Sequence, residues 1–200
     1  MELAKALERR RSVKSYEPYD LDRETIYNLL DQAALSPSAW NLQQWKVIVV
    51  DTDEAKEKLY NAANKQIKIK ESSATFIILG DLNAHETIGD IADDWIDHKH
   101  IPADKKSGLI QSVQQFFESD SNRRDEAIRG ASLFAMSLML VSEDAGLATC
   151  PMIGFDKQAV IDAFNIEDNL VPAMLISIGK GEMNNDRASR IPASAFAKFE

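Results

Sequence analysis

The amino-acid sequence predicts a single domain that mixes α-helices with β-strands. Its 200 residues are enough for one well-buried core and too few for two ordinary domains. Short apolar runs of strand length occur at residues 45–51, 75–80 and 172–179, and the segments between them carry the spacing of amphipathic helices. No repeat, linker or low-complexity segment divides the chain, so we expect one domain over residues 1–200.

The composition excludes several classes of protein. With 44% hydrophobic and 28% charged residues, the chain has the composition of a soluble globular protein. Its formal net charge of −9 argues against nucleic acid as the main partner. No apolar run approaches the about 20 residues that span a bilayer, and no signal-peptide core is present, so no membrane association is expected. Cys150 is the only cysteine, so a disulfide within the chain is impossible and a cytoplasmic location is expected.

The first helix, predicted over residues 2–11, ends in a cluster of cations. Four of them fall within six residues: Arg9, Arg10, Arg11 and Lys14. This is either a solvated charge run or an anion site. In the second interpretation the guanidinium groups bind phosphate in a bidentate manner and Ser12 adds a hydroxyl group.

Residues 36–50 join a helix to a strand through a polar, proline-containing turn. The preceding residues, 21–35, have a helical apolar face and Asp22 as the expected N-cap. The turn is either a tight connection around a buried Trp45, or a loop that presents polar side chains and N–H groups to a small molecule.

A third helix is predicted after the first strand. It is expected to be capped by Asp53 and to run to Ala63. The amide of Gln66, in the charged segment that follows, has no evident structural task. Residues 75–80 are continuously apolar, which predicts a strand buried on both faces.

Residues 83–122 are polar and helical, and Ile101-Pro102 divides them into two helices. All three histidines lie in this region. His98 and His100 are two residues apart, a spacing that points side chains away from each other on a helix. No metal site is therefore expected.

Residues 123–147 form the longest helical pattern, which is expected to end at Gly146. The pattern is apolar nearly all round, so the helix must be buried on several sides. We expect it to lie at the domain centre, at a subunit interface, or at both.

A loop is predicted after a strand that contains Cys150. Pro151 and Gly154 are expected to bend the chain before Asp156 caps a helix that runs to about Phe164. The loop is either a structural turn or a segment whose backbone N–H groups face a flat ligand. Because its neighbours are apolar, the cysteine is expected to be structural.

The segment beyond Gly181 is polar and has no core of its own. A tail of this kind is expected to be disordered or to lie on another subunit.

Together, four separated motifs resemble the nitroreductase family of flavin enzymes. They are Arg10-Arg11-Ser12-Val13-Lys14, the turn Ser36–Trp45, Pro151-Met152-Ile153-Gly154-Phe155-Asp156 and Arg190-Ile191-Pro192. The resemblance implies an α+β fold, a three-layer sandwich in which a mostly antiparallel sheet is flanked by helices. It also implies an intertwined homodimer in which the C-terminal tail of one subunit adds a strand to the sheet of the other.

The resemblance also implies FMN at the subunit interface. The implied phosphate and ribityl contacts are Arg10, Ser12 and Arg190, with Arg11 beside them. The implied contacts at the polar edge of the flavin ring are Lys14 and Gln66. The implied turn from the partner subunit consists of Pro37, Ser38, Ala39 and Asn41. The implied loop along the other ring face consists of Pro151, Met152, Ile153 and Gly154.

The implied activity is that of an FMN-dependent NAD(P)H oxidoreductase. Hydride passes from NADH or NADPH to flavin N5, and then to a nitroaromatic, quinone or similar electron-poor acceptor. Lys14 and the backbone N–H groups of Ile153 and Gly154 are implied to tune the flavin, so no protein acid or base is expected.

Alternatives remain open at this point. The chain could bind or sense flavin without turnover, or carry out other flavin chemistry of the family, namely dehalogenation, flavin fragmentation or azoline oxidation. The acceptor, the preferred nicotinamide and the roles of the aromatic residues near the expected pocket are also open. Those aromatic residues are Trp40, Trp95, Phe116 and Phe117.

Four positions depart from the family pattern, one of them Trp40, which is bulky for the turn and is expected to narrow the pocket. Gln44 stands where many members have proline, and Ile153 replaces an acidic residue of some relatives. Ala188 falls where some members carry a basic residue near the phosphate, and Arg187 is a possible substitute for it.

Overall fold

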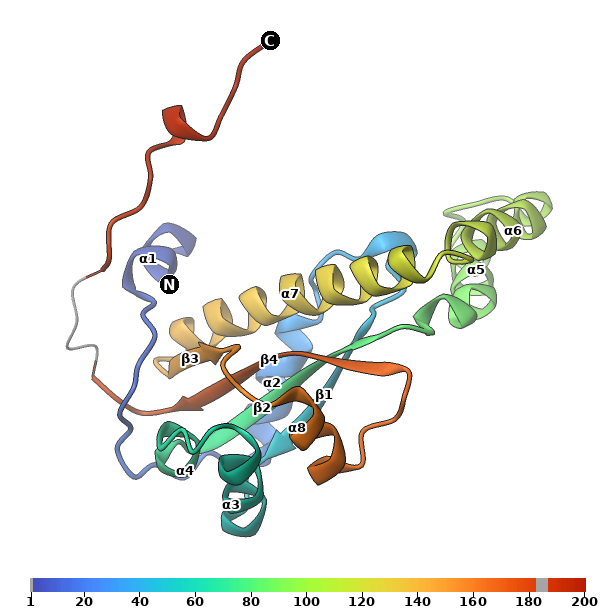
Figure 1. Cartoon of the computed structure of the whole chain (residues 1–200). Helices are drawn as coiled ribbons and strands as arrows, with labels where there is room; N and C mark the ends of the chain where they lie inside the picture. The colour runs from blue at the N-terminus through green and yellow to red at the C-terminus, as the bar shows by residue number, and fades with distance from the viewer. Residues whose placement is uncertain (1, 183–186) are drawn as a thin grey trace.

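The computed structural model describes residues 2–182 and 187–200 (Figure 1). Within them, helices cover both faces of one sheet, which confirms the α+β three-layer fold. The strands are β1 (Trp45–Val50), β2 (Ala74–Asp81), β3 (Ala148–Met152) and β4 (Leu170–Gly179). The helices are α1 (Leu3–Arg9), α2 (Arg23–Ala33), α3 (Asp53–Ala62), α4 (Lys68–Glu71), α5 (Ile88–Asp97), α6 (Lys106–Phe116), α7 (Asp120–Asp144) and α8 (Lys157–Phe164).

The strand order is β1-β2-β4-β3, and every neighbouring pair is antiparallel. β2 is buried from Ala74 to Gly80, as its continuous apolar run predicts. In this strand order, β1 and β3 are the two edges of the sheet.

Alternate side chains of the strands enter two separate cores. On one face, Phe76, Ile78 and Ile176 pack against α2 and α7. On the other face, Ile77 and Leu79 pack against α3, α4 and α8. The period of two along each strand thus produces the three layers.

Side-chain caps mark the start of four of the described helices, among them α7, where the Oγ of Ser119 accepts from the N–H of Asn122. Asp22 and Asp156 accept hydrogen bonds from the third residue after them, as predicted. The predicted cap Asp53 is wrong, because the Oγ1 of Thr52 accepts from the N–H of Ala55 at 3.3 Å. Thr52 has extended dihedral angles whereas Asp53 is already helical, so Thr52 is the N-cap.

The predicted loop after Cys150 begins later than expected. Pro151 and Met152 lie within β3, so of the four residues expected along the ring face only Ile153 and Gly154 belong to the loop. Since β3 is an edge strand, the missing N–H of proline is tolerated there.

His98 and His100 face each other, contrary to the prediction from helical spacing. α5 ends at Asp97 and Lys99 has a φ of 60°, so the chain reverses between the two imidazoles. Their ring centroids are 6.1 Å apart at an interplanar angle of 19°. Among the described residues no group of three metal-ligating side chains is found.

α5 and α6 form a projection at the N-terminal end of α7, beyond the sheet (Figure 1). The break near Ile101-Pro102 separates the two helices, as predicted. α7 begins at Asp120, three residues before its predicted start, and Gly146 follows its end with a φ of 70°. No helix in the described part of the chain is long and apolar enough to cross a membrane.

Candidate functional site

A cationic pocket of about 220 Å³ lies where the segment after α1 meets the C-terminal tail. Its lining residues are Arg10, Arg11, Ser12, Lys14, Arg187, Ala188 and Arg190. Of these described lining residues, five are cations and none is a carboxylate. The fold thus brings Arg190 to the N-terminal cation cluster, from the other end of the sequence.

The N-terminal half of this pocket is positioned by β3. Val13 donates a backbone hydrogen bond to the carbonyl of Thr149 at 3.0 Å, and Ser12 pairs with Thr149 in a parallel bridge. Val13 is buried, whereas Ser12 and Lys14 on either side of it are exposed. The alternation of an extended chain therefore aims the two polar side chains away from the core.

Two guanidinium groups of the pocket have unused donors. The Nη1 of Arg10 and the Nε of Arg11 are buried and have no hydrogen-bond partner within the described residues. A buried donor without a partner costs about 1–3 kcal/mol, and more when it is charged. These donors fit an anion, which would complete their hydrogen bonds.

Arg187 closes the pocket from the side of the tail. Its Nη2 donates to the carbonyls of Leu7, Glu8 and Arg10 at 2.5, 3.1 and 3.0 Å. Loss of solvation and then the charges of Arg11, Arg190 and Arg10 lower the pKa of the Arg187 guanidinium below its usual value. The pocket therefore holds an excess of positive charge that an anion would neutralise.

Gln66 is brought to the loop that follows β3. The amide groups of Gln66 and Asn64 both donate to the carbonyl of Gly154, at 3.1 and 2.9 Å. The neighbouring side chain of Ile153 is 80% exposed. Sequence reasoning missed Asn64, although asparagine is one of the residues that tolerate the left-handed conformation, which Asn64 and Lys65 both adopt with φ of 54°.

These groups form a strip along the β3 edge of the sheet. The parallel register from Ser12 and Thr149 places Lys14 beside Pro151. The arginines lie toward the start of β3, and Gly154 with its amide partners lies past its end. Most of the predicted residues of one subunit thus lie on one edge.

The turn of residues 36–44 has a strained backbone, and none of its residues is among the described residues that line the cationic pocket. Trp40, Asn41 and Gln43 have φ of 50°, 56° and 49°. Such conformations cost non-glycine residues of order 1–3 kcal/mol each and cluster at functional sites. The Oγ of Ser38 accepts from the N–H of Gln43 at 3.0 Å, and that of Ser36 lies 2.7 Å from the hydroxyl of Ser137 on α7.

Within one chain, this turn does not contribute to the described lining of the cationic pocket. The predicted turn residues Pro37, Ser38, Ala39 and Asn41 are absent from the described residues that line the pocket. The prediction that they come from a partner subunit stays a prediction.

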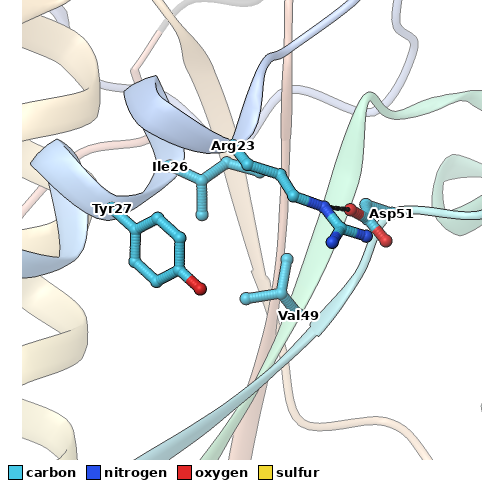
Figure 2. Close-up of a pocket in the computed structure, with 5 residues that line it drawn as sticks. All are labelled: Arg23, Ile26, Tyr27, Val49 and Asp51. Carbon is cyan, nitrogen blue, oxygen red and sulfur yellow. Dashed lines mark hydrogen bonds and ion pairs between the residues drawn. The ribbon is translucent and has the colours of Figure 1, made fainter.

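A second hollow of about 220 Å³ lies beside β1, at the opposite edge of the sheet. Figure 2 shows its lining: Arg23, Ile26, Tyr27, Val49 and Asp51. The Nε of Arg23 pairs with the Oδ2 of Asp51 at 3.1 Å. None of the predicted cofactor contacts lines this hollow.

Comparison with known proteins supplies the family. The model of the nitroreductase family matches residues 7–180. This chain belongs to the nitroreductase family.

Relatives match along almost the whole length of this nitroreductase-family chain. A Bacillus subtilis protein provisionally named NAD(P)H nitroreductase YodC is 38% identical over 189 residues, 94% of each chain. The crystal structure of the B. subtilis nitroreductase ydfN, also a provisional name, has a TM-score of 0.94 at 36% identity and covers 100% of this chain and 99% of its own. A structure from Exiguobacterium sibiricum, described as a nitroreductase in complex with FMN, has a TM-score of 0.92 at 29% identity and covers 100% and 98%.

Proposed function

We propose that this protein is an FMN-dependent NAD(P)H oxidoreductase that reduces electron-poor small molecules such as nitroaromatics and quinones. The observation that carries the proposal is the cationic pocket, with its buried and unused guanidinium donors and no carboxylate among its described lining residues. When bound, FMN would supply hydride transfer from NADH or NADPH to an acceptor. The FMN complex of a related nitroreductase supports this cofactor.

Arg10, Ser12 and Arg190 would hold the phosphate, with Arg11 beside them. Guanidinium groups form charge-assisted and often bidentate hydrogen bonds with phosphate oxygens. Ala188 stands where some family members carry a basic residue near the phosphate. The neighbouring Arg187, which also lines the pocket, would supply that positive charge. Because the pocket measures about 220 Å³, it suits the phosphate end of the cofactor, and the ring must extend beyond it.

The ring would follow the β3 edge toward the loop of Ile153 and Gly154. Lys14 would place a positive charge at the polar edge of the ring, which stabilises negative charge there. The amide of Gln66 already bonds Gly154, so it would both fix the loop and present its oxygen to the ring. Pro151 and Met152 would contribute backbone of the edge strand.

The working unit would be a homodimer in which Pro37, Ser38, Ala39 and Asn41 of one subunit complete the site of the other. The exposed backbone of β1 can accept a further strand, and the hollow of Figure 2 lies beside it. The tail carries apolar side chains that lack cover in one chain: Ile191, Phe196 and Phe199. We infer that the tail of each subunit lies along β1 of its partner.

The test is a visible absorption spectrum of the purified protein, repeated without oxygen after addition of NADH and then NADPH. We expect a flavin spectrum that bleaches with at least one of the two and returns when a nitroaromatic or quinone is added. A flavin spectrum that stays unbleached would favour a binding or sensing role. A protein that takes up no flavin after incubation with FMN would contradict the assignment of the cationic pocket.

A further inference from the structure

The α5–α6 projection is attached to the body of the protein through a small apolar cluster. Its buried members are Leu42, Ala84, Ile88, Val113 and Phe117, and Trp40, Ile91, Leu109 and Ile110 pack against them. All of these lie within residues 84–117 except Trp40 and Leu42, which belong to the strained turn. In this cluster, the projection therefore packs against the rest of the protein through Trp40 and Leu42 of the turn.

Trp40 contacts the chain where the projection returns to α7. Its ring centroid is 5.2 Å from that of Phe116 and 5.8 Å from that of Phe117, at interplanar angles of 60° and 66°. Phe117 in turn stacks on His85, at 5.1 Å and 19°. Since His85 precedes α5 and Phe116 ends α6, one row of rings joins both ends of the projection to the turn.

The backbone of Trp40 depends on these ring contacts. A bulky residue rarely adopts a φ of 50°, because its Cβ approaches the following carbonyl. Packing of the indole against both phenylalanine rings, which also contact each other at 5.1 Å, offsets this strain. Conversely, a turn that relaxed at Trp40 would withdraw the indole from the projection.

We propose that Trp40 couples flavin binding to the ordering of α5 and α6. The inference rests on the proposed function, in which the neighbouring residues Ser38, Ala39 and Asn41 contact the flavin. A flavin ring that binds this turn favours its left-handed conformation, which keeps the indole packed against Phe116 and Phe117 and so orders the projection. Trp40 is thus a positioning residue, and the coupling is reciprocal, since an ordered projection favours flavin binding by the same factor.

Hydrogen–deuterium exchange of the full-length protein, with and without FMN, tests the coupling. In the wild type, FMN is expected to slow exchange in the peptides of α5 and α6. In Trp40→Ala, exchange of these helices should be about tenfold faster without FMN, because two aromatic contacts are lost. FMN should then no longer slow it, although the cationic pocket still binds the cofactor. Trp40→Phe should restore part of the FMN effect.

Trp95→Ala is the matched control, because it removes the same side chain from α5 and leaves the turn intact. We expect FMN to slow exchange of α6 in this variant as it does in the wild type. If Trp40→Ala responds to FMN like the wild type, or if FMN binds without slowing the projection, the coupling is wrong while the proposed function stands. If the wild type binds no FMN, both are wrong.

Discussion

Tyr16 ties the segment that carries the cation cluster to the centre of the sheet. Its hydroxyl lies 3.1 Å from the carbonyl oxygen and 2.9 Å from the Oγ of Ser177 on β4, and the ring is buried. Burial, only partly offset by the hydrogen bond with the Ser177 side chain, raises the pKa of the phenol well above its usual value. The phenol therefore stays protonated in the folded protein under all ordinary conditions.

This shift predicts a loss of stability in alkaline solution. Above about pH 10 the phenol ionises in the unfolded chain but not in the folded one, so the folded state binds more protons and the free energy of unfolding falls as pH rises. Tyr16→Phe should cost about 1–3 kcal/mol at pH 7.5, because the partners at Ser177 lose a donor. The difference from the wild type should shrink at pH 11. Urea unfolding at both pH values checks this, and an equal difference at the two would contradict it.

Arg10→Ala tests the phosphate assignment. Charge-assisted hydrogen bonds contribute about 1.5–3 kcal/mol, so the Kd for FMN should rise roughly 10- to 100-fold. Without FMN the same variant should be no less stable than the wild type, because one of several like charges is gone. Quenching of flavin fluorescence and thermal unfolding measure the two effects.

Lys5→Ala is the control for Arg10→Ala, because Lys5 is an exposed cation of α1 that is absent from the described lining of the pocket. It should leave FMN affinity unchanged. Equal losses in the two variants would indicate a general charge effect rather than a phosphate site.

At the scale of elements, α7 approaches the base of the strained turn through Gly130. A Cβ at Gly130 would lie 2.8 Å from the Oε1 of Gln44. The Gln44 amide is buried, and within the described residues neither its Nε2 nor its Oε1 has a hydrogen-bond partner. Glutamine at this position, where many family members have proline, therefore depends on the absence of a side chain on α7.

Gly130→Ala requires the end of the buried Gln44 side chain to move, so it should destabilise the protein by about 1 kcal/mol, although alanine is the better helix former. In a Gln44→Ala background the same change should cost far less. A double-mutant cycle by chemical unfolding measures the coupling, which we expect to reach about 1 kcal/mol or more.

Gly108→Ala in α6 is the matched control. Apart from its chain neighbours and its own helix backbone, no atom of the described residues lies within 4 Å of a Cβ built at Gly108, so alanine should stabilise the helix by up to about 1 kcal/mol. If Gly130→Ala were also stabilising, the contact with Gln44 would carry no energetic weight.

At the scale of the whole molecule, the C-terminal tail exposes large apolar side chains to solvent in the single chain. Phe199 is 95% exposed and Phe196 is 68% exposed. Apolar side chains of this size are expected to be buried in the working assembly.

Deletion of residues 196–200 removes both phenylalanines and keeps Arg187 and Arg190 in the cationic pocket. We expect the shortened protein to be monomeric by light scattering and to bind FMN at least about tenfold more weakly, because the partner turn is lost. Far-ultraviolet circular dichroism should still report the folded core. A shortened protein that remains dimeric with full FMN affinity would contradict the exchanged tail.

Most helices and strands could be predicted because they depend on local properties. Hydrophobic periodicity marked the buried strand at 75–80 and the helix that ends before Gly146, and side-chain chemistry marked the caps Asp22 and Asp156. The cap of α3 was predicted wrongly because two neighbouring residues could both act as the N-cap. Thr52 and Asp53 are both good caps, and backbone dihedral angles decided between them.

Local pattern also failed where pairing with a distant strand was decisive. Pro151 belongs to β3 because its neighbours pair with β4 at the edge of the sheet, where proline is tolerated. His98 and His100 meet because the helix ends at Asp97, which spacing alone does not reveal.

The candidate site divides in the same way. The sequence by itself determined the residue types: guanidinium groups near both ends, a lysine, an amide and a glycine loop, in an order that resembles one family. Only the tertiary structure decided that Arg187 reaches the carbonyls after α1, that Asn64 and Gln66 share the carbonyl of Gly154, and that Trp40 holds the α5–α6 projection. The physical reason is that composition and periodicity act over a few residues, whereas these contacts join segments far apart in the chain and exist only once the layers have packed.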